Sequence, residues 1–116
     1  MSAKPTARFR LRVTVGEAIA VGPGKIALLE AIRETRSLTA AAKLIGMSYR
    51  RAWILIDALN GSRKKPAVPS LQGGEHGGGS ELTPAGVALV DLYRKIEARA
   101  AAAAADDIQA LLELVR

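Results

Sequence analysis

Hydrophobic and polar residues alternate near the start of the chain. Over Arg8–Val15 the apolar residues occupy every second position, at Phe9, Leu11, Val13 and Val15. This period of two predicts a half-buried strand. Gly16-Glu17 can turn the chain into a short return strand over Ala18–Val21, and Gly22-Pro23-Gly24 then breaks it. Residues 1–22 are therefore expected to form an N-terminal strand or hairpin.

The spacing of apolar residues becomes helical after this break. Over Lys25–Arg36, Ile26, Leu29 and Ile32 share one face, which Leu28 widens. Residues three and four apart lie on the same side of a helix, so this segment is predicted to be a short amphipathic helix.

Two further helices are predicted by their caps. Thr39 is a suitable N-cap for the compact helix AAAKLI, and Gly46 can supply the left-handed backbone that ends it. Ser48 is a second N-cap, for a helix that runs from near Tyr49 to about Asn60. Two helices separated by a short glycine-containing turn form the helix-turn-helix pattern.

The second half of the chain joins a glycine-rich segment to a long helical pattern. QGGEHGGGS lies between two short strand candidates, Ser70-Leu71 and Glu81-Leu82, and can form the long hairpin of a wing. Thr83 then caps a helix with Pro84 at its first position, where a missing N–H costs nothing. Asp106-Asp107 either interrupts this helix or lies within it, ahead of an apolar stripe at Ile108, Leu111, Leu112 and Val115.

The charge of the chain is unevenly distributed. The net charge is +6 overall, with +9 on residues 1–74 and −3 on residues 75–116. A basic body indicates a polyanionic partner. A solvated surface that is simply basic is the alternative interpretation.

Composition excludes several classes of protein. The sequence has no cysteine, so disulfides and thiolate metal sites are excluded and a reducing cytoplasm is expected. We expect no membrane span, because no apolar run approaches about 20 residues. His76 is the only histidine, so no metal site with several histidines is possible within one chain. The sequence shows no paired carboxylates with a clear cleft, no nucleophile motif and no cofactor signature. We therefore expect neither enzymatic activity nor a cofactor.

The segment GMSYRRAW, residues 46–53, carries the candidate chemistry. Ala52, Ile56 and Leu59 are predicted to face the core, together with Met47, which leaves the first turn of the helix partly outward. In helix-turn-helix proteins the N-terminal residues of the second helix meet base edges in the major groove. Arginine pairs with guanine or with phosphate. We therefore predict DNA contacts from Ser48, Tyr49, Arg50 and Arg51, followed by Thr39. Trp53 is expected to pack at the edge of the core, under the wing or a connecting strand, whereas Tyr49 can reach phosphate or an internal partner.

The same residues resemble a known family. GPGKIALLEAIRETRSLTAAAKLIGMSYRRAW, followed by GGEHGGGSELTPAG, is similar to the N-terminal DNA-binding domain of the molybdate-responsive ModE regulators. That family has a winged helix-turn-helix with a G-[MI]-S-Y-[KR]-x-A-W core, matched at residues 46–53. It also has a glycine-rich wing followed by LT-x-x-G, matched at residues 73–79 and 82–86. The resemblance covers roughly residues 8–98.

The resemblance implies a homodimer on a two-fold symmetric DNA operator. The helix after Pro84 would carry much of the dimer contact through Leu89, Tyr93 and Ile96, although packing of this stripe against its own domain is an alternative. The resemblance also implies wing contacts to DNA from Gly74, Glu75, His76 and Gly77. Glu75 stands where a basic residue is expected, and an acid near phosphate would weaken that contact. Ile54 stands where the family often has a polar or acidic residue, which indicates an altered base preference or local packing. Because family members continue into molybdate-binding domains and this sequence stops at Arg116, we expect no direct molybdate binding.

The combined prediction is a mainly α fold with a small β component. It comprises an N-terminal strand or hairpin over residues 1–22, a winged helix-turn-helix core over 23–82 and a helical dimerisation segment over 83–116. The predicted function is sequence-specific transcriptional regulation. Two alternatives are an architectural protein that coats DNA with little sequence preference, and a module that binds a partner protein through residues 100–116.

Overall fold

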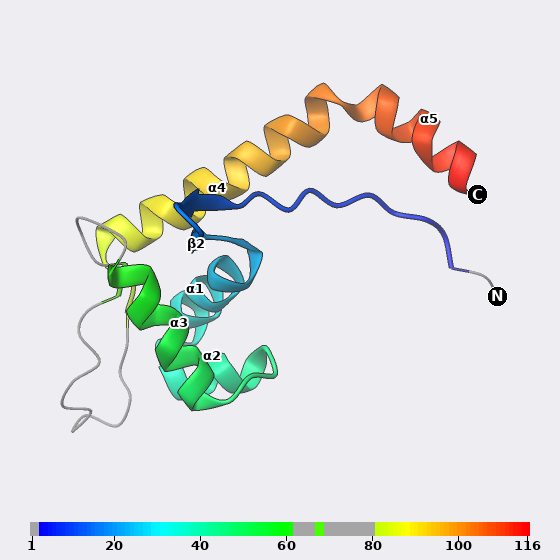
Figure 1. Ribbon diagram of the computed structural model, residues 1–116. Helices are drawn as coiled ribbons and strands as arrows, with labels where there is room; N and C mark the ends of the chain where they lie inside the picture. The colour runs from blue at the N-terminus through cyan, green and yellow to red at the C-terminus, as the bar shows by residue number, and fades with distance from the viewer. Residues whose placement is uncertain (1–2, 62–66, 69–80) are drawn as a thin grey trace, which may run out of the picture.

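The computed structural model describes residues 3–61, 67–68 and 81–116. These residues form two short strands followed by five helices, which confirms a mainly α fold with a small β component. Figure 1 shows the first three helices grouped together, with the last two extending away from them as a long bent arm. The segments 62–66 and 69–80, which contain the predicted wing, lie outside the described residues.

The N-terminal hairpin is shorter than the alternation of residues predicts. Strand β1, Val13–Val15, pairs antiparallel with β2, Ala18–Val21, and the register is irregular between Val13 and Thr14. Gly16 adopts a φ of 62° in the connecting turn. The predicted strand over Arg8–Val15 is wrong before Val13, because residues 3–12 (the N-terminal arm) have no strand partner and run beside α4 instead. The half-buried pattern is also wrong, since all of β1 is exposed.

Three helices enclose the core. Helix α1, Pro23–Thr35, buries the predicted residues Ile26, Leu28, Leu29 and Ile32 completely. It packs against α2, Leu38–Leu44, and α3, Tyr49–Gly61. Alanines at α2 allow the helices to approach closely, because Ala41 and Ala42 are buried in the contact. Helix α1 is therefore the central element around which the others are arranged.

The C-terminal arm consists of two helices rather than one. Helix α4, Pro84–Ala103, ends at Ala104, where φ is −104° and ψ is 13°, and α5, Ala105–Val115, follows at an angle. Asp106 and Asp107 lie in the first turn of α5, where the helix dipole favours negative charge. The interruption therefore comes two residues before Asp106, inside the alanine tract.

Ion pairs join α1 to the middle of α4. The Arg94 guanidinium donates to both carboxylate oxygens of Glu30, from Nε at 2.8 Å and from Nη2 at 2.5 Å. Arg33 Nη1 lies 2.9 Å from Asp91 Oδ1. The hydrogen bonds from Arg94 hold the pKa of the Glu30 carboxyl below its usual range. These pairs fix α4 across α1 and so set the direction of the C-terminal arm.

Candidate nucleic-acid interface

A serine cap sets the start of α3. The Ser48 hydroxyl accepts a hydrogen bond from Arg51 N at 3.1 Å, while the Ser48 carbonyl accepts from Ala52 N at 3.0 Å. The predicted N-cap is thereby confirmed. Tyr49, Arg50 and Arg51 form the exposed first turn that follows.

The opposite side of α3 is locked into the core. Ala52, Ile56 and Leu59 are buried, as their spacing predicts, and Met47 packs against them in part. This burial fixes the rotation of α3 about its axis. The helix therefore presents a defined outer face.

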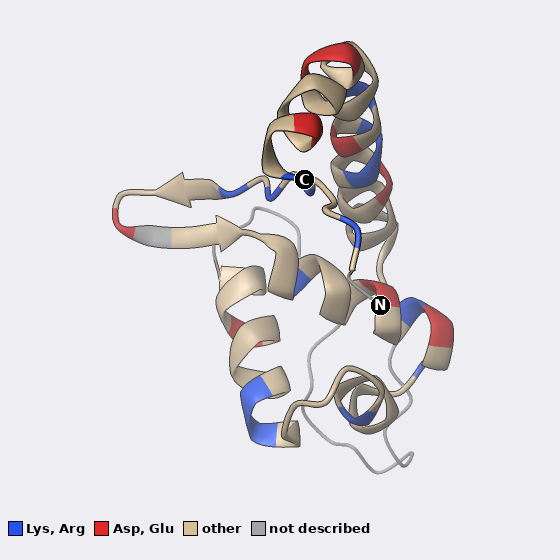
Figure 2. Ribbon diagram, turned by 90° about the vertical axis from the view of Figure 1, so that its right-hand side faces the viewer, with Lys and Arg blue, Asp and Glu red and all other residues tan. Residues whose placement is uncertain are grey.

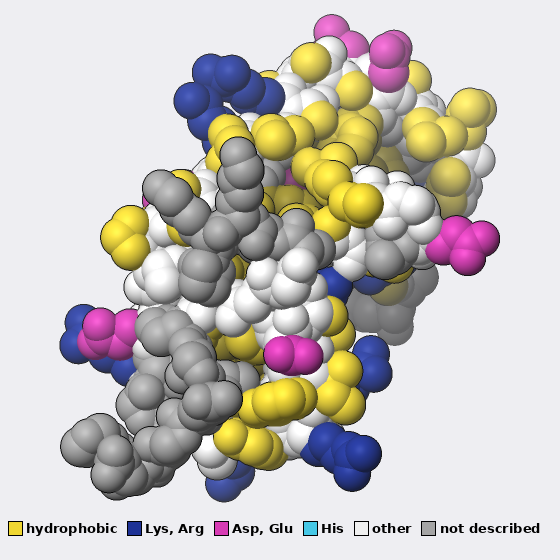
Figure 3. Space-filling view, turned by 60° about the vertical axis from the view of Figure 1, so that its left-hand side comes forward, with side chains coloured by type: hydrophobic (Ala, Val, Ile, Leu, Met, Phe, Trp, Pro, Cys, Tyr) yellow, Lys and Arg dark blue, Asp and Glu magenta, His cyan; other side chains and the backbone are white. Residues whose placement is uncertain are grey.

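The outer face carries large apolar side chains among its charges. Tyr49 is 50% exposed, Trp53 41% and Ile54 49%, so each leaves substantial surface free. Figure 3 shows hydrophobic side chains beside Lys and Arg side chains on the lower part of this face of the molecule. The predicted packing of Trp53 under the wing involves segments outside the described residues. Ile54 is exposed on this face, so its side chain is not part of the buried core.

The turn before α3 depends on a left-handed glycine. Gly46 has a φ of 73°, which confirms the conformation predicted for it. Gly46 N donates to the Lys43 carbonyl at 3.2 Å, and Met47 N donates to the Ala42 carbonyl at 2.9 Å. These bonds satisfy carbonyls at the end of α2 and direct the chain into α3.

The cap of α2 differs from the prediction. Ser37, not Thr39, is the N-cap, and its hydroxyl accepts from Ala40 N at 3.1 Å. The helix begins two residues early because Leu38 is buried in the core and must lie on the inner face of the first turn. Thr39 is exposed in that turn, on the surface of α2.

Hydrogen bonds close the base of the glycine-rich segment. Asn60, near the end of α3, accepts from Ala67 N at 3.0 Å through Oδ1 and donates to the Val68 carbonyl at 3.0 Å through Nδ2. The Ala67 carbonyl in turn accepts from Thr83 N at 2.9 Å and Thr83 Oγ1 at 3.1 Å. The chain therefore leaves this point at Val68 and returns to it at Thr83.

The same contact explains the start of α4. Thr83 Oγ1 accepts from Gly86 N at 3.0 Å, which confirms the predicted cap, and Pro84 occupies the first turn. Gly86 lies so close to Ala67 that a Cβ at this position would be 2.2 Å from the Ala67 carbonyl oxygen. The LTPAG sequence is thus both a helix start and a close packing site.

The residues predicted to form the wing lie mostly outside the described part of the chain. Gly74, Glu75, His76 and Gly77 lie outside the described residues, as does the strand candidate Ser70-Leu71. Its predicted partner Glu81-Leu82 forms no strand. The wing therefore stays a prediction.

The three predicted dimer residues on α4 differ in exposure. Tyr93 is 3% exposed, and its hydroxyl donates to the Leu11 carbonyl at 2.7 Å, so its contacts lie within its own chain. Burial raises the pKa of the Tyr93 hydroxyl. Leu89 is half-buried against the core, whereas Ile96 is exposed together with Leu92 one turn earlier.

Basic residues gather at the first turn of α3 and along the N-terminal arm (Figure 2), and acidic residues occupy the first turn of α5. Within the described part of the chain, neither Arg50 nor Arg51 forms an ion pair. Sequence reasoning did not single out the arm, although arginine at positions 8, 10 and 12 is a visible signal.

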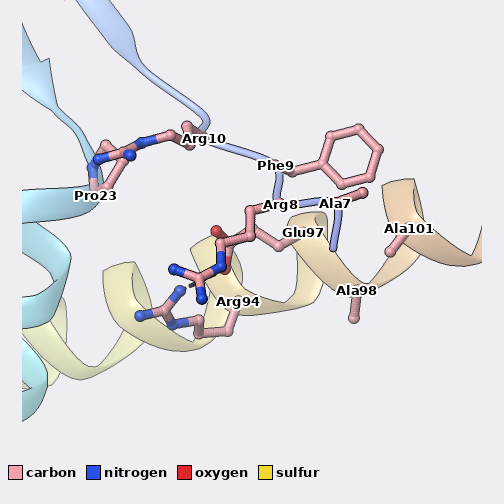
Figure 4. Close-up of a pocket in the computed structure, with 9 residues that line it drawn as sticks. All are labelled: Ala7, Arg8, Phe9, Arg10, Pro23, Arg94, Glu97, Ala98 and Ala101. Atoms are coloured by element: carbon pink, nitrogen blue, oxygen red, sulfur yellow. Dashed lines mark hydrogen bonds and ion pairs between the residues drawn. The ribbon is translucent and has the colours of Figure 1, made fainter. Parts of the chain in front are cut away.

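The N-terminal arm also forms a cleft with α4. Figure 4 shows Arg8 above Arg94 and Glu97, while Arg10 extends toward Pro23. The cleft has a volume of about 560 Å³. No group of three or more potential metal ligands occurs among the described residues, and none of the helices in that part of the chain is long and apolar enough to cross a membrane.

Fold and interface together describe a small helical domain that presents the basic, aromatic end of one helix. No protein-family model matches the chain. It is 45% identical to the molybdenum-pterin-binding protein MopB of Rhodobacter capsulatus over 67% of this chain and 29% of that protein. It is 41% identical to the molybdenum transport protein ModE of Azotobacter vinelandii over 78% of this chain and 33% of that protein.

A further relative is the DNA-binding transcriptional dual regulator ModE of Escherichia coli, 33% identical over 75% of this chain and 33% of that protein. The chain is therefore related to the ModE and Mop proteins, which supports the resemblance found in the sequence. It spans about a third of the length of these curated relatives. Their names describe a molybdenum-pterin-binding protein, a molybdenum transport protein and a DNA-binding transcriptional regulator.

Proposed function

We propose that this chain is a sequence-specific transcriptional regulator that binds double-stranded DNA through a winged helix-turn-helix. The observation that carries the proposal is the first turn of α3. Its inner side is fixed by buried Ala52 and Ile56, while Tyr49, Arg50 and Arg51 point outward without carboxylate partners among the described residues. A helix held this way can present the same side chains to every DNA site it meets.

The chemistry of this turn suits base recognition. An arginine fork can donate two hydrogen bonds to guanine in the major groove. Tyr49 and Ile54 can add contacts to phosphate or to a thymine methyl group, and Ser48 and Thr39 place hydroxyl groups at the starts of the two helices. In this proposal α2 crosses the DNA backbone and α3 enters the groove.

The proposed wing is supported by the hydrogen bonds that join the two ends of the glycine-rich segment. Hydrogen bonds from Thr83 to Ala67 bring the two ends of the glycine-rich segment to one point beside the end of α3. A loop that starts and ends there can reach DNA beside the recognition helix. Gly74, Glu75, His76 and Gly77 are the residues proposed for that contact.

The proposed assembly is a homodimer joined through the C-terminal arm. Leu92 and Ile96 lie one turn apart on α4 and remain exposed, and α5 buries no residue within the chain. An amphipathic helix with an uncovered apolar stripe is stabilised by a partner. Two copies would place two recognition helices on a two-fold symmetric operator. A different protein bound through residues 100–116 is the second candidate occupant of this surface.

The names of the relatives also bear on location and effector. Regulators of transcription act in the bacterial cytoplasm, and we propose that location for this chain. Several relatives are named for molybdenum, but the matched region is about a third of their length. We propose that residues 1–116 do not bind molybdate directly. We also propose that residues 1–22 form the hairpin, residues 23–82 the DNA-binding core and residues 83–116 the dimerisation segment.

A base-preference measurement tests the proposal. A preferred site is first selected from random duplex DNA, and affinity for it is compared with affinity for a scrambled duplex. Arg50→Ala should lower the ratio of the two affinities by roughly 5- to 150-fold, because a bidentate arginine–guanine pair contributes about 1–3 kcal/mol of discrimination. Lys95→Ala, on the exposed surface of α4, is the control and should leave the ratio unchanged.

The alternatives give different results. If Arg50 contacts only phosphate, Arg50→Ala weakens binding to both duplexes equally and lowers the salt slope by about one. If the wild-type chain shows no preferred site and its binding disappears as salt rises, it is an architectural protein and the proposal is wrong.

A further inference from the structure

A groove of about 290 Å³ lies between the N-terminal arm, the start of α1 and the first turns of α3. Four cationic side chains line it, those of Arg10, Arg12, Lys25 and Arg51. Among the described residues, no carboxylate lines it. Apolar residues, which include Ile19 and Leu55, also line it. These residues define what we call the basic groove.

The arm is held in place by a contact distant in the sequence. The buried Tyr93 hydroxyl of α4 donates to the Leu11 carbonyl, and the Leu11 side chain packs against the core. In an extended segment successive side chains point to opposite sides. Fixing Leu11 on the core side therefore directs Arg10 and Arg12 together into the groove, in agreement with its lining.

The α3 side of the groove separates the two neighbouring arginines. Arg51 and Leu55 are one turn apart and both line the groove. Arg50 lies about 100° further around the helix, on the face that it shares with Ile54, and it does not line the groove. Arg51 therefore lies in the basic groove, whereas Arg50 lies on the outer face of α3 with Ile54.

The cations of the groove are not neutralised within the described residues. Arg10, Arg12 and Arg51 form no ion pair with a carboxylate there. Lys25 Nζ donates to the Ile19 carbonyl, which holds the ammonium group at the groove without cancelling its charge. Four like charges in one groove repel each other, and an anion bound among them offsets that repulsion.

We propose that the basic groove binds phosphates of the DNA backbone beside the bases that α3 reads, and that Arg51 contacts phosphate rather than bases. This inference rests on the proposed function and adds a second contact surface to it. Phosphate oxygens suit the arginine fork, and the groove is continuous with the exposed first turn of α3. The arm thus extends the DNA contact beyond the recognition helix and the wing.

The test compares salt dependence between matched variants. Arg10→Gln/Arg12→Gln removes two charges from the groove, and Lys95→Gln/Arg99→Gln removes two exposed charges from α4 that do not line it. Because α4 belongs to the proposed dimerisation segment, size-exclusion chromatography must first show that the α4 variant assembles as the wild-type chain does. Each lost phosphate contact reduces the slope of log affinity against log salt by about 0.9. Between 50 and 200 mM salt the wild-type chain should therefore lose about tenfold more affinity than the groove variant. The ratio between preferred and scrambled duplexes should not change.

Each other outcome overturns the inference in an identifiable way. If the wild-type chain prefers its site but the groove variant has the same salt slope, phosphate binding by the basic groove is contradicted and the proposed function is not. An equal fall in the α4 variant shows that only net charge matters. A changed preference ratio shows base reading by the groove. If the wild-type chain has no preferred site, the proposed function itself has failed and the inference falls with it.

A second experiment distinguishes binding of backbone phosphate from binding of a small free oxyanion. Inorganic phosphate and molybdate are titrated against DNA binding at constant ionic strength. The inference predicts no saturable competition by either ion at millimolar concentration. Competition that the groove variant abolishes would show an oxyanion site instead. Circular dichroism of both variants should match the wild-type chain, because all four substituted side chains are exposed.

Discussion

The replacement Gly86→Ala should destabilise the domain, because Gly86 lies against the backbone of Ala67. A Cβ at position 86 would be 2.2 Å from the Ala67 carbonyl oxygen, 3.0 Å from its carbonyl carbon and 3.2 Å from its Cα. Ordinary contacts of this kind begin at 3.4 Å. Backbone atoms cannot rotate away as a side chain can, so either α4 or the segment at Ala67 must move.

The expected cost follows from three contributions. Overpacking of a close contact costs about 1–3 kcal/mol. Displacing Ala67 also weakens two hydrogen bonds from Thr83 to its carbonyl, each contributing about 1 kcal/mol. Against this, alanine is favoured over glycine in a helix by about 1 kcal/mol. The net loss in free energy of unfolding is therefore about 2–4 kcal/mol.

Urea denaturation, followed by circular dichroism at several protein concentrations, measures this change. The midpoint should fall by about 1 M or more, since the slope for small domains is about 1–3 kcal/mol per molar urea. Gly24→Ala is the matched control: it lies in the first turn of α1, and a Cβ there meets no atom within 4 Å. This control should be as stable as the wild-type chain or more so. A Gly86→Ala variant within about 0.5 kcal/mol of the wild type would refute the close approach of α4 to Ala67.

Two further predictions concern buried and paired groups. Tyr93→Phe removes the hydrogen bond to the Leu11 carbonyl and should cost about 1 kcal/mol in urea denaturation. Because burial raises the pKa of Tyr93 in the folded state, its contribution is complete below pH 10 and is lost as pH rises further, so the wild type should lose stability there more steeply than Tyr93→Phe. The pKa of Glu30 is lowered by Arg94, so its contribution is present above pH 4.5 and lost as pH falls; Glu30→Gln should remove this acid dependence. The side chains of Glu30 and Arg94 are each more than a third exposed, so solvent screening limits this change in the free energy of unfolding to about 0.2–1 kcal/mol. If the wild type and Glu30→Gln lose stability equally as pH falls, the prediction is contradicted.

Helices α1, α3 and the start of α4 could be predicted because their signals are local. Ser48 and Thr83 cap the helices that their positions in the sequence indicate. The residues spaced three and four apart on α1 and α3 are the buried ones. In such segments the period of the pattern and the preference of the cap agree, so the sequence is sufficient.

Features that depend on distant contacts could not be predicted in this way. Thr39 and Ser37 are both competent caps, and burial of Leu38 in the core decides between them. The alternation before Val13 is typical of a strand, but the hydrogen bond from Tyr93 holds Leu11 against α4 instead. The helix break at residue 104 lies in an alanine tract that carries no local signal.

The candidate interface shows the same division. The first turn of α3 could be identified from GMSYRRAW, because cap, core spacing and basic residues occur within one short segment. The basic groove could not, because it brings Arg12 and Lys25 to Arg51 from three separate parts of the chain. Neighbouring Arg50 and Arg51 have equivalent places in the sequence, and only the rotation of α3 separates them.

Selection of bound fragments from random duplex DNA at near-physiological salt tests the central claim most directly. The proposed function predicts enrichment of a two-fold symmetric site, with half-sites about one helical turn apart, both with and without molybdate. Recovery of no common sequence, from a folded chain whose binding disappears as salt rises, would contradict sequence-specific recognition by α3.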